Sequence, residues 1–395
     1  MSRHSPLYPW ISTVATHLPH LSRPQATVLA FWGFGMVTVG ACGCTTVAAF
    51  LAKLLGQKEN TLRQRLREWY WAAPEKQGDQ RRTLDVAPCF AELLRWILQG
   101  WAPHEHRIAL ALDATTLGQR FTALVISVLY RGCAIPVAWV VIPATAPGAW
   151  KPHWLKLLAG FERTLPATWT VLVLADRGLY AHWLYRAVVR LGWHPFFRIN
   201  RGGKFRPPES NTFQWLSALV PTTGSRWCGR VFCFKSQSLD CTLLARWEVG
   251  YQDPWLVVTD LAPEQAAVGW YALRAWIECG FKDIQRGGWQ WQQTRITDPA
   301  RAARFWLALA VATLWVVSVG GEGQATVPAS SWDGLPATHI ARRRSPRRSR
   351  PRQLSCFRQG HLEILAALIN GTAQPLGRFL PEPWPDSLLV KVHRE

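Results

Sequence analysis

Residues 107–142 read RIALALDATTLGQRFTALVISVLYRGCAIPVAWVVI, a stretch that carries three apolar runs separated by polar or turn residues. The runs cover residues 108–112, 121–130 and 135–142, and runs of this length between turn signals are typical of strands. The dipeptide Arg131-Gly132 marks a turn between the second and third runs. The stretch therefore predicts three adjacent strands.

The residues that follow alternate between helical and strand patterns. Helices are expected over about 150–165 and 179–191, and strands over 169–175 and 194–199. The predicted order is strand-strand-strand-helix-strand-helix-strand. Because the apolar strand 169–175 lies between two helices, the pattern favours a mixed α/β sheet that is covered on both faces.

A helix-turn-helix pattern lies on the N-terminal side, between residues 45 and 71. Apolar residues recur at helical intervals on both sides of Gly56, which is expected to end the first helix. Arg63, Arg65 and Arg67 follow the outer surface of the second helix, where phosphates or base edges could be met. A solvated helical hairpin that does not contact DNA is the alternative.

The chain divides into five parts by composition. Residues 200–260 are rich in Gly, Pro and Ser with short β-like runs, which predicts an inserted β unit. Residues 342–352 contain seven arginines among Ser and Pro, which predicts a basic flexible tail. We expect a helical N-terminal region (1–104), a sheet core (105–199), a β insertion (200–262), further core helices (263–325) and a linker with a tail (326–395).

The overall composition is that of a large folded protein with a basic surface. Of the 395 residues 49% are hydrophobic, enough for a sizeable core with appended modules. The 45 Lys and Arg residues against 25 Asp and Glu residues give a net charge of +20. This excess favours a polyanionic partner, either nucleic acid or an acidic membrane surface.

The cysteines and the N-terminus indicate a cytoplasmic location. The nine cysteines form neither a disulfide framework nor paired CxxC motifs, which fits a reducing compartment, and the first residues lack the features of a secretory signal. Two uncharged stretches, 26–52 and 305–320, are expected to be buried core helices and not membrane spans, because they continue into patterned helices. A membrane protein is the remote alternative.

Two aspartates are expected at the carboxyl ends of strands. Asp113 follows Ile108–Leu112, and Asp176 follows the apolar run that ends at Ala175. Ligand sites of α/β sheets form at those ends, so both acids are candidate site residues. An ordinary strand-end turn or helix cap is the alternative for each aspartate alone.

A third acid, Glu278, lies in a predicted helix over residues 270–286. Tyr271, Arg274, Glu278, Lys282 and Gln285 form a polar stripe at helical spacing beside an apolar one, so Glu278 borders the buried face. An exposed ladder of ion pairs along this helix is the alternative.

These residues resemble a family of DDE-type bacterial insertion-sequence transposases, the IS-four-like group with the signature Tyr-x2-Arg-x3-Glu-x6-Lys. Tyr271, Arg274 and Glu278 match its first three positions, and the two aspartate motifs occur in the right order within about residues 107–310. Gln285 stands where the group has lysine. On the predicted helix, Lys282 and Arg286 lie within about 80 degrees of Gln285 and could replace that lysine.

The resemblance implies a ribonuclease-H-like core with a β insertion between the second aspartate and the glutamate. It implies catalysis by Asp113, Asp176 and Glu278, with double-stranded DNA as the partner, a homodimer on DNA and a place at the bacterial nucleoid. One tryptophan of the insertion is expected to stack on a base. The candidates are Trp215, Trp227, Trp247 and Trp255, and the predicted DNA contacts are Tyr271, Arg274, Lys282, Arg286, Arg177, Arg63 and Arg67.

Three converging carboxylates repel one another, so a divalent metal is expected to neutralise them. Their oxygen ligands favour two Mg²⁺ ions, with Mn²⁺ tolerated, which would serve phosphoryl transfer at element ends and at target DNA. Asp113 is expected to bridge the ions, and Asp176 and Glu278 to complete one shell each. A nuclease of the same fold that does not join DNA, and a noncatalytic DNA-binding derivative, are the alternatives.

Overall fold

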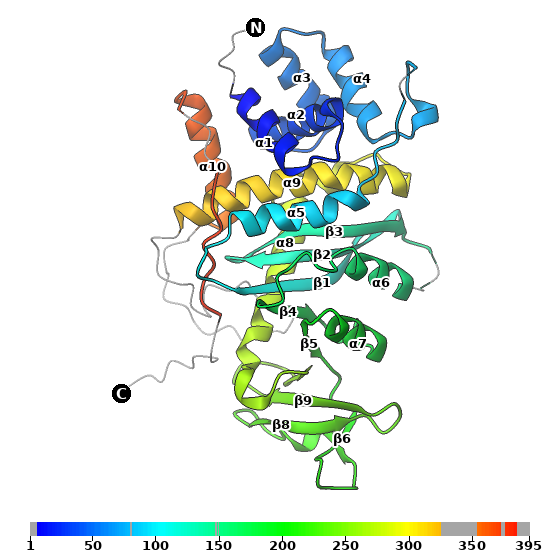
Figure 1. The fold of residues 1–395 in the computed structure, drawn as a ribbon, viewed down its shortest axis with the longest axis vertical. Coiled ribbons are helices and arrows are strands. Elements are labelled where there is room, and N and C mark those ends of the chain that lie inside the picture. The colour runs from blue at the N-terminus through cyan, green and yellow to red at the C-terminus, as the bar shows by residue number, and fades with distance from the viewer. Residues whose placement is uncertain are drawn as a thin grey trace.

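The computed structural model describes residues 6–79, 81–146, 148, 150–324, 354–372 and 376–384. The arginine-rich segment 342–352 lies outside these residues. Figure 1 shows a bundle of helices at one end, a sheet in the middle and a β-rich end.

One sheet of ten strands runs through the molecule, in the order β3-β2-β1-β4-β5-β10-β9-β8-β6-β7. The three predicted adjacent strands are present as antiparallel neighbours, and β1 pairs in parallel with β4, which pairs in parallel with β5. Every other pairing is antiparallel, so the sheet is mixed and mostly antiparallel. The first five strands are β1 (Arg107–Leu117), β2 (Phe121–Tyr130), β3 (Cys133–Pro143), β4 (Thr170–Ala175) and β5 (His194–Arg198).

The β-rich residues that follow continue the same sheet. Strand β10 (Trp255–Thr259) pairs with β5 on one side and with β9 (Leu239–Arg246) on the other, so the chain returns to the core edge after its excursion. The outer strands are β8 (Arg226–Cys233), β6 (Lys204–Arg206) and β7 (Gln214–Trp215).

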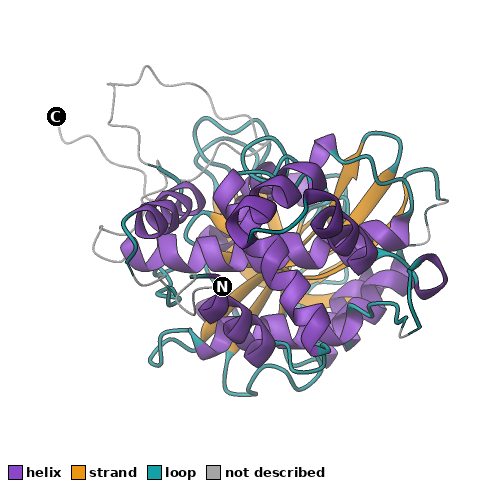
Figure 2. Ribbon diagram, turned by 90° about the horizontal axis from the view of Figure 1, so that it is seen from above, coloured by secondary structure: helices purple, strands orange, loops and turns teal. Residues whose placement is uncertain are grey.

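Each face of the sheet has its own apolar cluster. On one face, alternate residues such as Leu110 and Val173 pack with the helices α5 (Ala87–Gln99), α6 (Lys151–Ala159) and α7 (His182–Arg190). On the other face, the intervening residues, such as Ala111 and Leu174, pack with Tyr271, Leu273 and Ile277. The period of two along each strand explains this division. Figure 2 shows helices lying over the strands when the molecule is seen from above.

The N-terminal helices are separated from the sheet by the long helix α9 (Pro299–Gly323) (Figure 1). They are α1 (Leu7–His17), α2 (Arg23–Val39), α3 (Cys44–Leu55) and α4 (Glu59–Tyr70). Gly56 ends α3 as predicted, and its φ of +62° is the left-handed conformation that glycine adopts without strain. The last helix, α10 (Cys356–Ile369), packs closely on α9, where Gly360 lies against the backbone of Val316.

Helix α9 is long and apolar enough to cross a membrane, but 89% of its apolar segment is buried inside the protein. The stretch 26–52 forms α2 and α3, which meet at an angle of 97°. The prediction of a buried core helix is therefore confirmed for residues 305–320. The 3-10 turns of the described residues are η1 (Ala73–Glu75), η2 (Leu216–Ala218), η3 (Pro263–Gln265), η4 (Val268–Ala275) and η5 (Trp291–Gln293).

The prediction of a single helix over residues 270–286 is wrong. The chain forms the 3-10 turn η4, then α8 (Trp276–Ile284), and Gln285 has a non-helical φ of −90° and ψ of −125°. Because a 3-10 turn has three residues per turn, Tyr271 and Arg274 lie one above the other and both turn inward. Arg286 lies beyond the end of α8. The prediction that Lys282, Gln285 and Arg286 are neighbours on one helix is therefore also wrong.

Candidate active site

Three parallel strands place charged residues in one row. Leu112 of β1 is opposite Ala175 of β4, and Ala175 is opposite Phe197 of β5. The next residue along each strand is therefore Asp113, Asp176 and Arg198, respectively. Because side chains alternate between faces, all three belong to the face that packs against η4 and α8.

Asp113 does not end its strand as predicted. Strand β1 continues to Leu117 because it keeps pairing with β2, whereas its pairing with β4 stops at Leu112. Asp176 does follow the end of β4, and its Oδ1 accepts hydrogen bonds from the backbone N–H groups of Gly178 and Leu179. Asp113 Oδ1 accepts one from Ala114. These bonds leave the Oδ2 atoms for partners across the site.

The guanidinium of Arg274 lies between the three predicted acids. Its Nη2 is 2.6 Å from Asp113 Oδ2 and 3.6 Å from Asp176 Oδ2, and its Nη1 is 2.7 Å from Glu278 Oε1. The Arg274 side chain is 6% exposed, against 16%, 28% and 24% for the three acids in that order. The arginine therefore lies deeper than the carboxylates. The alternative interpretation, an exposed ladder of ion pairs along the helix, is wrong because Arg274 faces the sheet.

Burial and charge shift the acid-base behaviour of this cluster. Burial raises the pKa of Asp113 to about 6, against the opposing effect of the nearby Arg274 guanidinium. Burial by itself would lower the pKa of Arg274, but Asp113 and the other carboxylates raise it overall, so the guanidinium stays charged. Burial also raises the pKa of Tyr271 to about 12. Tyr271 is buried edge-on to Trp255, with their ring centroids 5.5 Å apart.

Gln285, at the position where the resembled group has lysine, turns toward the sheet. Its Nε2 donates a hydrogen bond to Thr115 Oγ1 at 3.1 Å, two residues from Asp113. Lys282 and Arg286 are exposed instead. The amide therefore links the end of α8 to β1.

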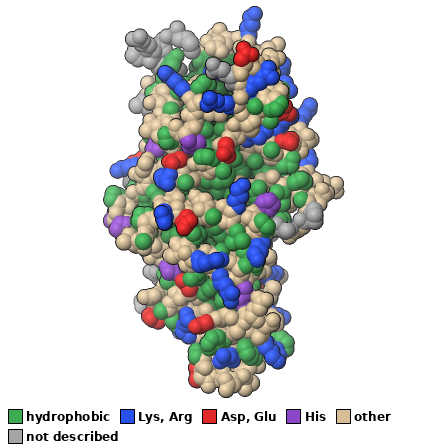
Figure 3. Space-filling model, turned by 45° about the vertical axis from the view of Figure 1, so that its right-hand side comes forward, with side chains coloured by type: hydrophobic (Ala, Val, Ile, Leu, Met, Phe, Trp, Pro, Cys, Tyr) green, Lys and Arg blue, Asp and Glu red, His purple; other side chains and the backbone are tan. Residues whose placement is uncertain are grey.

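The other predicted DNA contacts are not part of this cluster. Arg177 forms an ion pair with Asp253 at 3.6 Å, and Arg201 is 3.9 Å from the same carboxylate. Arg63 and Arg67 lie on α4, beyond α9 from the sheet (Figure 1). Figure 3 shows Lys and Arg side chains distributed along one face from the helical end to the β-rich end.

Sequence reasoning missed Arg198. Its side chain is 5% exposed, its Nη2 donates to the carbonyl of Pro254 at 3.2 Å, and no ion pair with a carboxylate is found for it among the described residues. The strand pattern could have revealed Arg198. This arginine follows the apolar residues Pro195, Phe196 and Phe197, just as Asp176 follows the apolar strand β4. Burying a cation costs free energy unless an anion pairs with it, so Arg198 is a candidate partner for an anionic ligand.

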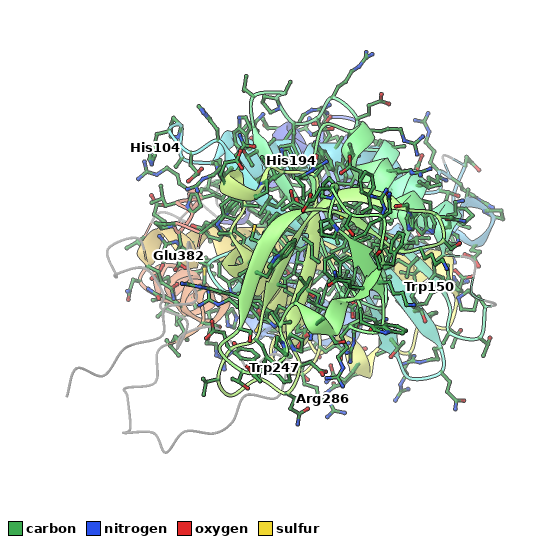
Figure 4. All side chains as sticks on the ribbon, turned by 90° about the horizontal axis from the view of Figure 1, so that it is seen from below. His104, Trp150, His194, Trp247, Arg286 and Glu382 are labelled. Atoms are coloured by element: carbon green, nitrogen blue, oxygen red, sulfur yellow. The ribbon has the colours of Figure 1, made fainter. Side chains whose placement is uncertain are left out.

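A cavity of about 320 Å³ opens in the β-rich end. Trp215 and Trp247 line it together with Arg201. Trp215 is 55% exposed, and Lys204 Nζ lies 4.4 Å from its ring centroid. Of the other two predicted tryptophans, Trp255 is buried in the core and Trp227 packs beside Phe205. Figure 4 labels Trp247 and Arg286 near the same edge of the molecule in the view from below.

The acids match the donor chemistry of a hard divalent cation, because three carboxylates already converge on one positive group. In the described arrangement, however, no three acidic, histidine or cysteine side chains are close enough to share one metal ion. Arg274 separates the carboxylates at the place where such an ion would bind.

The sequence profile of the Transposase DDE domain matches residues 105–315, more than half of the chain, and the chain belongs to this family. It is a DNA transposase, a metal-dependent enzyme that cuts and joins DNA. Among solved structures the chain is similar to piggyBac transposase in a cryo-EM structure of its synaptic complex with hairpin DNA, with 11% identity and a TM-score of 0.36 over 79% of this chain and 76% of that one. No curated protein matches the sequence.

Proposed function

We propose that Asp113, Asp176 and Glu278 are the catalytic acids of this transposase. The observation that carries the proposal is their convergence on Arg274 from β1, from the end of β4 and from α8, across 165 residues of sequence. The strand order β3-β2-β1-β4-β5 supports a ribonuclease-H-like core, extended through β10 by the β-rich residues. Tyr271, Arg274 and Glu278 support membership of the Tyr-Arg-Glu-Lys group.

The three acids would hold the divalent metal, with Mg²⁺ as the expected ion and Mn²⁺ as a substitute. A bound metal would supply Lewis-acid activation of the attacking water or 3′-hydroxyl and stabilise the leaving oxygen. The hydrogen bonds from Ala114, Gly178 and Leu179 fix one oxygen of each aspartate, so the other oxygen faces the site. This preorganisation is what a site that orients reacting groups needs.

Arg198 and Arg274 supply positive charge at the same place, where a DNA phosphate would bring the missing anion. Guanidinium groups pair with phosphate oxygens in two parallel hydrogen bonds, which fixes direction as well as distance. We assign Arg198 to this role beside Arg274 and Tyr271, and Lys282, Arg286 and Arg177 to the exposed edge of the DNA path.

The exposed Trp215 and the cavity beside it support a stacking role for Trp215 or Trp247, whereas burial argues against Trp255. Base stacking on an aromatic ring contributes about 1–3 kcal/mol. Arg63 and Arg67 on α4 would contact duplex DNA outside the catalytic centre. A homodimer on DNA and a cytoplasmic location at the nucleoid remain part of the proposal.

Cleavage of a DNA end by the purified protein tests the proposal. We expect strand cleavage with Mg²⁺ or Mn²⁺, none after removal of divalent metal with a chelator, and recovery when the metal is restored. Joining of the freed 3′ end to a second duplex separates a transposase from a nuclease of the same fold. Cleavage that persists in excess chelator would contradict the assigned role of the acids.

A further inference from the structure

Arg274 makes the same three contacts that a metal ion would need. One guanidinium reaches Asp113, Asp176 and Glu278 at 2.6, 3.6 and 2.7 Å, and among the described residues no group of three metal-binding side chains is left. Two cations cannot occupy this place together, because a divalent ion a few ångströms from a buried guanidinium is strongly repelled.

The Arg274 guanidinium also has one donor that is not satisfied. The Nε atom of Arg274 is buried and has no hydrogen-bond partner among the described residues. Close by, Arg198 is a second buried cation without an ion pair in the described part of the chain. An incoming phosphate oxygen would satisfy both guanidinium groups and reduce their mutual repulsion.

We propose that Arg274 is an internal counter-ion: it holds the three acids together in the metal-free, DNA-free protein, and it leaves them for a DNA phosphate when metal binds. The inference rests on the proposed role of the acids as metal ligands. Its consequence is cooperative binding, because DNA withdraws the cation that excludes the metal. Metal binding and DNA binding then strengthen each other by the same factor.

Metal affinity of the protein without DNA tests this inference. Mn²⁺ binding is measured by calorimetry for the native protein, Arg274→Gln and Arg274→Lys, with Arg131→Gln as a matched control. Arg131 is also a largely buried arginine beside a carboxylate, Glu382, and it lies away from the acids. The control removes the same unit of net charge, so only a local effect separates the variants.

Removing Arg274 should tighten Mn²⁺ binding at least roughly tenfold, because a charge a few ångströms from the ligands is lost while Gln adds none. Lysine carries the charge on a single ammonium group that cannot span three carboxylates, so Arg274→Lys should show a smaller gain. Arg131→Gln should bind Mn²⁺ as the native protein does. In the native protein, a short DNA duplex should tighten Mn²⁺ binding, and this gain should shrink in Arg274→Gln.

Unchanged or weaker Mn²⁺ binding in folded Arg274→Gln would overturn the counter-ion role, with folding checked by circular dichroism. If that variant does not fold, Arg274→Lys decides alone, and a lack of any gain overturns the inference. Failure of the proposed function is distinguished by cleavage: activity that survives Asp113→Asn means that the acids are not the metal ligands. Activity lost in Asp113→Asn, together with no gain in Arg274→Gln, removes only the counter-ion role.

Discussion

Asp113 and Asp176 are neighbours in the sheet because they follow the paired residues Leu112 and Ala175 on parallel strands, and both contact the same nitrogen, Nη2 of Arg274. Sixty-two intervening residues, which include the strands β2, β3 and β4 and the helix α6, thus separate two acids that share one partner. The parallel β1–β4 pairing sets their position, and the 3-10 turn η4 directs Arg274 toward them. The site therefore depends on the register of the sheet as much as on the identity of the acids.

Arg198→Gln should lower the rate of DNA cleavage by roughly ten- to a hundredfold, because one charge-assisted contact to phosphate contributes about 1.5–3 kcal/mol. Arg198→Lys should recover part of the rate. Single-turnover cleavage of an end duplex measures both. The matched control is Arg95→Gln, an exposed arginine beside Glu92 on α5 and outside the acid row. Equal rates in Arg198→Gln and the native protein would remove Arg198 from the site.

The arginines of residues 342–352 should bind DNA without reading its sequence, because an arginine run among Ser and Pro meets phosphates and not base edges. Deleting residues 340–395 would also remove α10, which packs on α9, so replacing the seven arginines with glutamine is the cleaner change. If about five phosphate contacts are lost, the slope of log K against log salt should fall by about 4.5. An unchanged slope would assign this segment to another partner.

Gln285→Lys should change cleavage less than about threefold, because the Gln285 side chain is directed to Thr115 and not to the exposed edge. Lys282→Ala should lower cleavage by about tenfold or more, since Lys282 is the exposed cation on the last turn of α8. A large gain from Gln285→Lys would instead indicate that the native chain lost a needed contact. Tolerance of both Lys282→Ala and Arg286→Ala would show that neither holds the DNA end.

Asp283→Asn should stabilise the protein at pH 8 but not at pH 4. Burial raises the pKa of Asp283 to about 7, opposed by Lys282, and the unfolded chain should titrate near the ordinary value of 3.8. Ionised Asp283 therefore destabilises the fold increasingly from about pH 4 to pH 7. The melting temperature of Asp283→Asn should exceed that of the native protein by at least about 2 °C at pH 8. Asp240→Asn, which changes an exposed acid, is the control.

Apolar runs between turn signals are local signals, so the sequence was sufficient to predict the core strands β1 to β5. The acids that the sequence singled out, Asp113, Asp176 and Glu278, lie together at Arg274, although Asp113 does not end its strand. It could not separate η4 from α8, because a 3-10 repeat and an α-helical repeat differ little over two turns. The position of Arg198 depends on the register between β4 and β5, which no local pattern specifies. The central place of Arg274 likewise follows from the packing of η4 against the sheet.

Asparagine or glutamine in place of each acid tests most directly whether Asp113, Asp176 and Glu278 hold the catalytic metal. Asp113→Asn, Asp176→Asn and Glu278→Gln each remove a proposed metal ligand and leave the side-chain shape nearly unchanged. Cleavage of an end duplex with Mg²⁺ and binding of the same duplex are measured together, with Asp240→Asn as the control. Each of the three variants should bind the duplex almost as the native protein does and give no cleavage, while the control should cleave normally. Cleavage that survives in any of the three would contradict the assignment of that acid.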